Sequence, residues 1–318
     1  MQEVAFLKKN AEYWKKVEAL VETNFQIKPD ELTELYIRLT DDLAYSKTFF
    51  PNSKTTLYLN TLTSRIHQRI YKTKKEKGDR IKTFWMFELP NLFYVHRMKL
   101  ATSMIIFVLA VLIGVISAAN DNAFVRTILG DGYVNMTLEN IKKNDPLAVY
   151  KKMNQVDMFL GITFNNIRVS FFAFIAGLLA SFGTAFLLLQ NGVMLGSFQY
   201  FFFEQGYLID SLLGIWIHGT LEISTIIIAG GAGIVLGNSL LFPGTFSRKE
   251  SFARGARDGM KIVTGLVPIF IAAGFLEGFV TRYTDMPLFV NLIIILGSLV
   301  FVILYFIIYP LKLNRQKV

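Results

Sequence analysis

A histidine and two glutamates lie inside stretches of the sequence that are otherwise apolar. His218 and Glu222 stand four residues apart in the run GIWIHGTLEISTIII, residues 214–228. On a helix this spacing places both side chains on one face. Glu277 lies in a second apolar stretch, residues 262–280. If the two stretches cross a membrane in opposite directions, the three side chains fall at one depth, so we expect one intramembrane cluster.

This intramembrane cluster allows three interpretations, because an unpaired charge inside a membrane is costly and marks either a packing contact or a functional site. In the first, His218 binds Glu222 or Glu277 and locks helices together. In the second, the three side chains line a water-accessible cavity for binding or translocation. In the third, they give a metal ion such as zinc three ligands in a hydrolytic site. The sequence leaves all three open and identifies no metal.

No catalytic residue can be assigned from the sequence. The chain has no cysteine, which excludes disulfides and thiolate metal ligands, and Ser224 shows no feature of an activated nucleophile. The glycine-rich run AGGAGIVLG, residues 229–237, lacks the spacing and the preceding strand of a dinucleotide-binding loop. We therefore predict no cofactor, and the sequence favours a protein that is not an enzyme.

The composition indicates the surroundings of these residues. Of the 318 residues, 53% are hydrophobic and 14% are aromatic, and the apolar ones concentrate after Lys99. The net charge of +9 is not accompanied by a recognisable nucleic-acid-binding module or by aromatic interleaving. We interpret the positive charge as basic segments that face the anionic inner leaflet. Membrane lipid is therefore the expected partner, and nucleic acid is not.

The apolar runs predict an all-α, polytopic helical membrane protein. A helix that crosses about 30 Å of hydrocarbon needs about 20 apolar residues, and four stretches satisfy this requirement. They are residues 100–119, 169–189, 262–280 and 287–308. A further stretch, 192–203, is shorter, and we expect it to form a short or tilted span.

The stretch from Leu212 to Phe242 is too long for one straight crossing. We expect a break at His218–Gly219, because glycine weakens a helix. Residues 219–242 would then span alone, and 208–217 would be re-entrant or interfacial. The prediction is about six spans, one of them broken or re-entrant, with five crossings plus a hairpin as the alternative.

Positive charge in short flanking segments sets the orientation of membrane helices. Residues 1–98 carry 17 basic and 12 acidic residues (17 − 12 = +5), and 245–261 carry five and two (5 − 2 = +3). In contrast, 120–159 carry five of each. Six crossings with both termini in the cytoplasm satisfy these differences. We therefore predict a multi-pass protein of the cell inner (plasma) membrane, with an outer loop at 120–167 and a basic cytoplasmic loop at 245–261 that contains Arg248, Arg254 and Arg257.

Residues 1–80 have the pattern of a cytoplasmic domain of amphipathic helices. Apolar residues recur at three- and four-residue steps in three segments, and the sequence PNS at 51–53 predicts a turn with Ser53 as an N-cap. Residues 81–99 are aromatic and end in basic residues, which predicts an interfacial helix before the transmembrane domain, 100–318. The expected core positions of the first domain are Val4, Leu7, Ala11, Trp14, Val17 and Val21, then Leu32, Leu35, Leu39 and Leu43, then Leu59, Leu62, Ile66 and Ile70.

Small residues recur at four-residue steps in the span at 219–242. Ala229, Gly233 and Gly237 form one small face, which favours close helix packing in membranes. We assign Gly219 to helix packing as well. Because such faces mediate self-association, we expect a homo-oligomer.

The motif HGTLEISTIIIAGGAGIVLGNSLLFPGTFSR, residues 218–248, resembles the signature of the stage II sporulation protein M family of bacterial integral membrane proteins. The likeness covers nearly the whole chain, from AFLKKNAEYWKKVEAL through FWMFELPNLF to AAGFLEGFVT. The resemblance places family positions at His218, Gly219, Glu222, Gly233, Gly237, Arg248 and Glu277.

The resemblance implies a role for the chain, because the family's namesake is a membrane anchor that recruits peptidoglycan-degrading partners in spore formers. We therefore expect a non-enzymatic membrane scaffold or anchor of an envelope-associated complex, with envelope or cell-wall proteins as partners. A transporter or channel component that uses the intramembrane His/Glu site is the alternative, and a metal-dependent intramembrane hydrolase is the third hypothesis.

Overall fold

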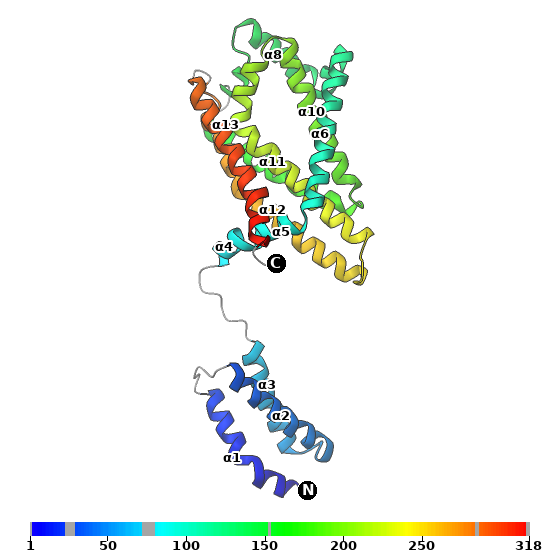
Figure 1. The fold of residues 1–318 in the computed structure, drawn as a ribbon, viewed down its shortest axis with the longest axis vertical. Coiled ribbons are helices and arrows are strands. Elements are labelled where there is room, and N and C mark those ends of the chain that lie inside the picture. The colour runs from blue at the N-terminus through cyan, green and yellow to red at the C-terminus, as the bar shows by residue number, and fades with distance from the viewer. Residues whose placement is uncertain (1, 23–28, 72–79, 152–153, 284–285, 316–318) are drawn as a thin grey trace. The chain divides into compact units, whose positions relative to one another are not determined.

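The computed structural model describes residues 2–22, 29–71, 80–151, 154–283 and 286–315. Within these ranges all regular structure is helical and no strand occurs, which confirms the all-α prediction. The chain divides into two compact units, Met1–Arg80 and Ile81–Val318 (Figure 1). We name them the head unit and the membrane unit. Residues 72–79 of the predicted cytoplasmic domain lie outside the described residues.

Three helices form the head unit: α1 (Glu3–Glu22), α2 (Pro29–Phe49) and α3 (Lys54–Tyr71). Val4 is 63% exposed, so its predicted place in the core is wrong. Phe6 takes that place, because it lies eight residues before Trp14 on the same helix face. The side chain of Ile70, another predicted core position, lies outside the part of the chain that the structure describes. The buried core consists of Phe6, Trp14, Val17, Leu39, Leu43, Leu59, Leu62 and Ile66.

The turn between α2 and α3 has the cap that its sequence predicts. The Ser53 hydroxyl accepts a hydrogen bond from the backbone N–H of Thr56 at 3.2 Å, which satisfies one of the free donors at the start of α3. The Thr56 hydroxyl in turn donates to the Phe50 carbonyl at 2.7 Å. This pair of bonds fixes the direction in which α3 leaves the turn.

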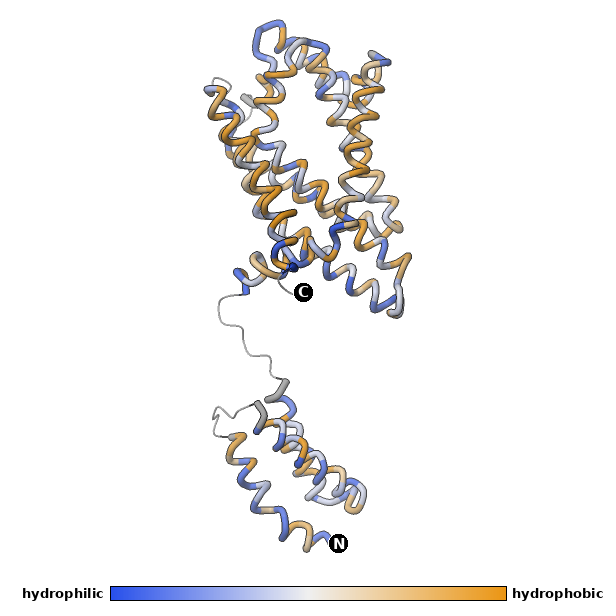
Figure 2. The backbone as a smooth tube through the Cα atoms, viewed as in Figure 1, coloured by the Kyte–Doolittle hydropathy of each residue, from blue (hydrophilic) through white to orange (hydrophobic). Residues whose placement is uncertain are grey.

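The membrane unit is a bundle of long apolar helices with polar residues concentrated toward its ends (Figure 2). A short entry segment precedes the bundle and consists of α4 (Arg80–Thr83), the π-helical turn η1 (Phe84–Glu88) and α5 (Leu89–Val95). Within the described part of the chain, six helices that are long and apolar enough to cross a membrane follow, in agreement with the predicted number. They span Arg97–Asn120, Gln155–Leu178, Phe182–Glu204, Leu208–Leu241, Arg248–Val280 and Leu288–Arg315.

The chain turns inside the predicted span 169–189, so that prediction is wrong. Helix α9 (Gln155–Ile175) continues into the 3-10 turn η3 (Ala176–Leu178), and three residues separate η3 from α10 (Phe182–Glu204). Between them Ala180 and Ser181 have φ values of 52° and 69°, in the left-handed region that reverses a helix. The Thr184 hydroxyl holds the turn by donating to the Ala173 carbonyl at 2.7 Å. Because the turn residues are themselves mostly apolar, hydrophobicity does not reveal them.

The predicted short span at 192–203 is the second half of α10, a helix of 23 residues. The predicted break at His218–Gly219 is also absent, because α11 (Leu208–Leu241) is one uninterrupted helix of 34 residues. Most of the length of α11 is buried between its neighbours. Packing on several sides therefore outweighs the weak helix propensity of glycine.

Two predicted loops are largely helical. The outer loop at 120–167 contains α7 (Asn122–Leu129), α8 (Asp131–Lys142) and η2 (Ala148–Lys151), and α9 already begins at Gln155. The basic loop at 245–261 is helical from Arg248, where α12 (Arg248–Phe275) begins with Ser247 as its N-cap. Only residues 242–247 connect α11 to α12. The bundle closes with η4 (Leu276–Val280), α13 (Leu288–Ile303), η5 (Leu304–Ile308) and α14 (Tyr309–Arg315).

Glycines allow the spans to approach one another at backbone distance. A Cβ on Gly114 of α6 (Arg97–Asn120) would lie 2.9 Å from the Val193 Cα of α10. At Gly233 it would collide with the Thr184 side chain and the Ala173 carbonyl, and at Gly237 with Ser181. These close approaches are all within the chain, so the small residues of α11 pack against the turn between α9 and α10.

The entry segment packs against the bundle at the end that holds the C-terminal helix (Figure 1). Leu89 and Phe93 of α5 are buried in the main apolar core with α12 and η5. The Tyr305 and Tyr309 hydroxyls donate to the carbonyls of Trp85 and Met86, both at 2.8 Å. These bonds satisfy two backbone acceptors in the π-helical turn η1, where the helical ladder is widened.

Candidate functional site

The structure brings His218, Glu222 and Glu277 together. One ligand atom from each side chain, a ring nitrogen or a carboxylate oxygen, lies within 4.8 Å of the other two. His218 and Glu222 come from successive turns of α11, and Glu277 comes from η4 on the neighbouring span. The Nε2 atom of His218 is 3.7 Å from Oε2 of Glu277. His218 is only 4% exposed, so the cluster lies inside the bundle.

A π-helical turn positions Glu277. The turn η4 ends the α-helical part of the span, and Gly278 lies against α9, where a Cβ would be 3.0 Å from the Gln155 carbonyl oxygen. Single π-turns are rare and are often found at functional sites. The wider turn, held close to α9 by Gly278, presents the neighbouring Glu277 carboxylate to α11.

Thr281 contacts the ring of His218. The Thr281 hydroxyl donates to the Leu276 carbonyl at 3.2 Å, and His218 Nδ1 lies 3.0 Å from the same hydroxyl oxygen. With its proton directed at the carbonyl, the hydroxyl accommodates the tautomer of His218 that carries its proton on Nδ1. In this tautomer the lone pair is on Nε2, the atom that faces Glu277. The cluster therefore presents one imidazole lone pair and two carboxyl groups to one point.

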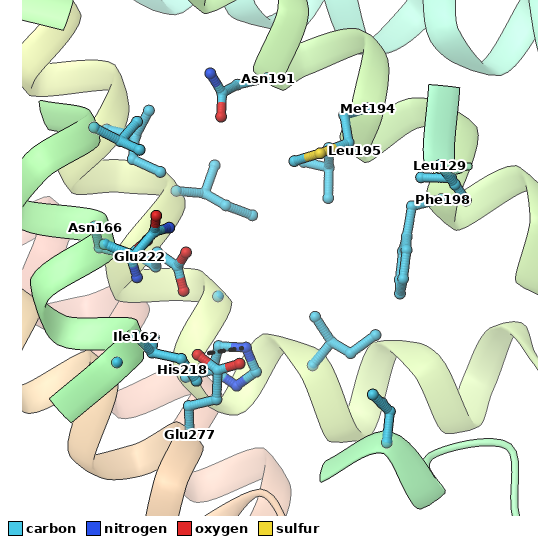
Figure 3. A pocket seen from close by; sticks show the side chains of 18 of the residues that line it. Leu129, Ile162, Asn166, Asn191, Met194, Leu195, Phe198, His218, Glu222 and Glu277 are labelled. Atoms are coloured by element: carbon cyan, nitrogen blue, oxygen red, sulfur yellow. Dashed lines mark ion pairs between the residues drawn. The ribbon is translucent and has the colours of Figure 1, made fainter. Parts of the chain in front are cut away.

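The cluster forms part of the wall of a cavity of about 650 Å³. The cavity lies between α9, α10 and α11, and residues of α7 and α8, including Leu129 and Tyr133, line its end. Figure 3 shows Glu222 beside Asn166 on one wall, with Asn191 of α10 across the space. The remaining wall is mostly apolar, with Met194, Leu195 and Phe198 opposite the cluster.

Amide side chains accompany the cluster, and the sequence analysis did not single them out. Asn165, Asn166 and Asn191 all line the cavity. Asn166 is buried, and its amide interacts with the carboxyl group of Glu222 beside it. The amide therefore adds a hydrogen-bond donor to the polar cluster. The signal was present as asparagines in an apolar segment, but the wrong span boundary at Val169 left Asn165 and Asn166 outside the predicted membrane region.

The side chain of Tyr133 in α8 lines the end of the cavity and carries a phenol group. Burial raises the pKa of the Tyr133 phenol above its usual value of 10.0, and a hydrogen bond with Thr137 opposes the rise. The phenol therefore stays neutral at physiological pH and can serve as a hydrogen-bond donor.

The other residues singled out in the sequence lie elsewhere. Gly219 lines the cavity, and the atoms near its missing Cβ are side-chain atoms of Ile215 and Ile223 in its own helix. Ala229, Gly233 and Gly237 are buried along the packed face of α11. Arg248, Arg254 and Arg257 belong to the first turns of α12 and do not line the cavity. Arg254 instead binds Glu250 at 2.8 Å and lies over the ring of Phe246.

The fold and the buried polar cluster define a class: an all-helical, polytopic membrane protein with ionisable side chains at an internal cavity. The model of the family described as stage II sporulation protein M matches residues 103–282, which is more than half of the chain. The chain therefore belongs to the stage II sporulation protein M family. A domain of unknown function (DUF8413) matches residues 4–72 in the head unit. No curated protein and no solved structure matches the chain.

Proposed function

We propose that the membrane unit is a ligand-binding component of the transporter type, which holds a divalent metal ion at His218, Glu222 and Glu277. The observation that carries this proposal is the convergence of three ligand atoms within 4.8 Å at the wall of a 650 Å³ cavity. The metal ion would offer its open coordination position to a ligand in that cavity. The proposal combines two interpretations of the cluster: a binding site at a water-accessible cavity, and a metal ion held by the three side chains.

The chemistry of the donor set supports a metal ion. Zinc accepts imidazole nitrogen and carboxylate oxygen, and sites that act on ligands keep three protein ligands and one open position. A ligating histidine commonly donates its second N–H to a carbonyl, a carboxylate or water, which fixes the ring. The contact from His218 to Thr281, and from Thr281 to the Leu276 carbonyl, has this arrangement.

A simple packing lock fits the surroundings less well. The three groups face a cavity instead of a closely packed interface. The His218 Nε2 and Glu277 Oε2 atoms are 3.7 Å apart, which is an ion-pair distance and longer than a hydrogen bond.

The scaffold role that the family resemblance implies stays a prediction. Such a role needs surfaces for partners and makes no use of a polar cavity inside the bundle. The chain's membrane location follows from the six apolar spans and the family. For the orientation, we keep both termini cytoplasmic, because an even number of spans puts both ends on one side and the basic start of α12 favours the cytoplasm.

Metal analysis of the purified full-length protein tests the proposal. The protein is incubated with zinc, freed of excess metal by gel filtration, and analysed by inductively coupled plasma mass spectrometry. We expect one zinc ion per chain, with the metal lost in His218→Ala and in Glu277→Gln. His67→Ala in the head unit and Glu204→Gln at the end of α10 are matched controls that keep the metal. Substoichiometric zinc that is equal in wild type and His218→Ala would contradict the proposal.

A further inference from the structure

The polar cavity continues into an apolar groove on the outside of the bundle. The groove has a volume of about 530 Å³ and lies between α9 and α10. Val169 and Asn191 line both spaces, so the groove is the continuation of the cavity along α9. Its walls are apolar side chains such as Phe172, Ile175, Leu178 and Leu187. From Val169 to Leu178 the groove extends over about 15 Å of helix.

Polar side chains mark the place where the cavity meets the groove. Asn165 is exposed and lines the cavity, and Arg168, three residues on, is exposed on the same side of α9. The Arg168 guanidinium carbon lies 5.5 Å from the ring centroid of Phe172, a residue of the groove wall. A cation therefore stands at the rim of an apolar groove.

Arg168 has an unusual position for a charged residue. It lies 13 residues after the start of its span and 10 before its end, which is about 20 Å and about 15 Å of helix. Among the residues that the structure describes, no carboxylate forms an ion pair with it. An exposed guanidinium at mid-span is costly and marks a ligand or ion pathway. Its position calls for an anionic group that enters from the membrane.

The polar cavity and the apolar groove together match a molecule with a polar headgroup and a hydrocarbon chain. The cavity with its metal cluster, the amides and Arg168 suit an anionic, oxygen-rich headgroup, and guanidinium and metal ions are the usual partners of phosphate. The groove suits a single hydrocarbon chain. We propose that the cavity and the groove together bind a lipid that carries a phosphate headgroup, which enters sideways from the bilayer between α9 and α10.

The charge and the continuity of the site favour this occupant over others. A neutral lipid gives no counter-ion to Arg168. A helix from a second copy fills the groove but carries no headgroup into the cavity. The part of the inference that joins the headgroup to the cluster rests on the proposed metal ion, since Asp157, Glu222 and Glu277 all line the cavity and carboxylates without a cation repel an anion. The parts that concern Arg168 and the groove do not require the metal.

Photo-crosslinking of the full-length protein in dodecyl maltoside micelles tests the inference. The probe is phosphatidic acid with a diazirine in one acyl chain, and diacylglycerol with the same chain is the phosphate-free comparison. Labelled peptides are identified by mass spectrometry. We expect phosphatidic acid to label peptides of α9 and α10 about tenfold more strongly than diacylglycerol does, as charge-assisted contacts to a phosphate require. Unlabelled phosphatidic acid should compete.

Two pairs of variants separate the headgroup from the chain. Arg168→Gln should lower phosphatidic acid labelling about tenfold, whereas Arg97→Gln, which removes another exposed arginine that lies over an aromatic ring, should not. Ile175→Trp should block the groove, whereas Leu160→Trp on the same helix should not. Ile175 and Leu160 are similarly exposed, at 47% and 44%, so tryptophan meets open space at both.

Several results would overturn the inference. Equal labelling by both probes indicates surface lipid only, and competition by inorganic phosphate equal to that of unlabelled lipid indicates a site for free phosphate. Crosslinks between two copies at the groove indicate that a second chain fills it. Zinc content is measured in the same samples. Selective labelling of protein that takes up no zinc supports the lipid site and contradicts the proposed metal, whereas bound zinc without selective labelling contradicts the lipid site alone.

Discussion

The Thr281 hydroxyl lies 3.0 Å from Nδ1 of His218 and links this buried ring to the Leu276 carbonyl of the neighbouring π-turn. The contact joins α11 to the end of the adjacent span and accommodates the tautomer with the proton on Nδ1. Thr281, which is 1% exposed, would therefore orient His218 in the proposed metal site without touching the metal.

Replacement of Thr281 tests this role. Thr281→Val keeps the shape of the side chain but removes the acceptor for the Nδ1–H of His218, so zinc affinity should fall about 10- to 100-fold. Thr281→Ser should retain most of the affinity. Competition with a fluorescent zinc chelator measures both. Equal affinity in the valine and serine variants would show that the hydroxyl does not orient the ring.

Gly161 offers a way to fill the cavity without disturbing the fold. A Cβ at this position would meet nothing within 4 Å, and residue 161 lines the cavity. We expect Gly161→Leu to leave the melting temperature unchanged or raised, since leucine is the better helix former by up to about 1 kcal/mol. The variant should keep its zinc and lose phosphatidic acid labelling. Scanning fluorimetry and the crosslinking assay report the two effects, and a marked fall in melting temperature would contradict the expectation.

Gly233 should tolerate no side chain. Its Cβ would collide with the Thr184 side chain and the Ala173 carbonyl, so Gly233→Ala should destabilise the membrane unit by about 1–3 kcal/mol through overpacking. Gly297→Ala in α13, where a Cβ meets nothing within 4 Å, is the matched control. The fraction of protein that remains monodisperse after a heating series in detergent compares the two. Equal curves would mean that α11 can move away from the turn at low cost.

The head unit depends on Trp14. This side chain is 2% exposed, and its Nε1 donates to Oδ2 of Asp42 at 2.8 Å. Trp14→Ala should cost about 3–5 kcal/mol and render the head unit sensitive to limited proteolysis. Val4→Ala, at a position that is 63% exposed, should leave the digestion pattern as in wild type. If both variants resist the protease, the stability of the head unit does not depend on Trp14.

The raised pKa of Tyr133 predicts a dependence on alkaline pH. Burial favours the neutral phenol, so the stability that this residue contributes is present below pH 10 and is lost as the pH rises through its higher folded value. In a spectrophotometric titration from pH 9 upward, the absorbance of tyrosinate is compared between wild type and Tyr133→Phe. The difference should appear at a higher pH than the ionisation of an exposed tyrosine. Ionisation at or below pH 10 would contradict this expectation.

The sequence was informative where a residue contrasts with its surroundings. His218, Glu222 and Glu277 stand out as ionisable groups in apolar runs, and their depth follows from the direction of the spans. The turn at Ala180–Ser181 lacks such contrast, because apolar residues occupy both the turn and the helices. The resulting boundary error removed Asn165 and Arg168 from the predicted membrane region.

The form of α11 depends on contacts that no local pattern records. Gly219 indicates a weak point by its own propensity, but neighbours on several sides hold the helix straight. The same limit applies to the cavity. The amides of Asn166 and Asn191 lie on different spans, and only the packing of α9 and α10 against α11 brings them to face one space.

The unbroken course of α11 has a mechanical consequence. With 34 residues the helix is about 51 Å long, which is more than the thickness of the hydrocarbon core. This one continuous helix carries His218 about 15 Å from its start and leads at its other end into the short connection to the basic start of α12. A tilt of the helix when a ligand settles beside His218 would swing its far end in the opposite sense, so occupancy on one side of the bilayer would be felt on the other.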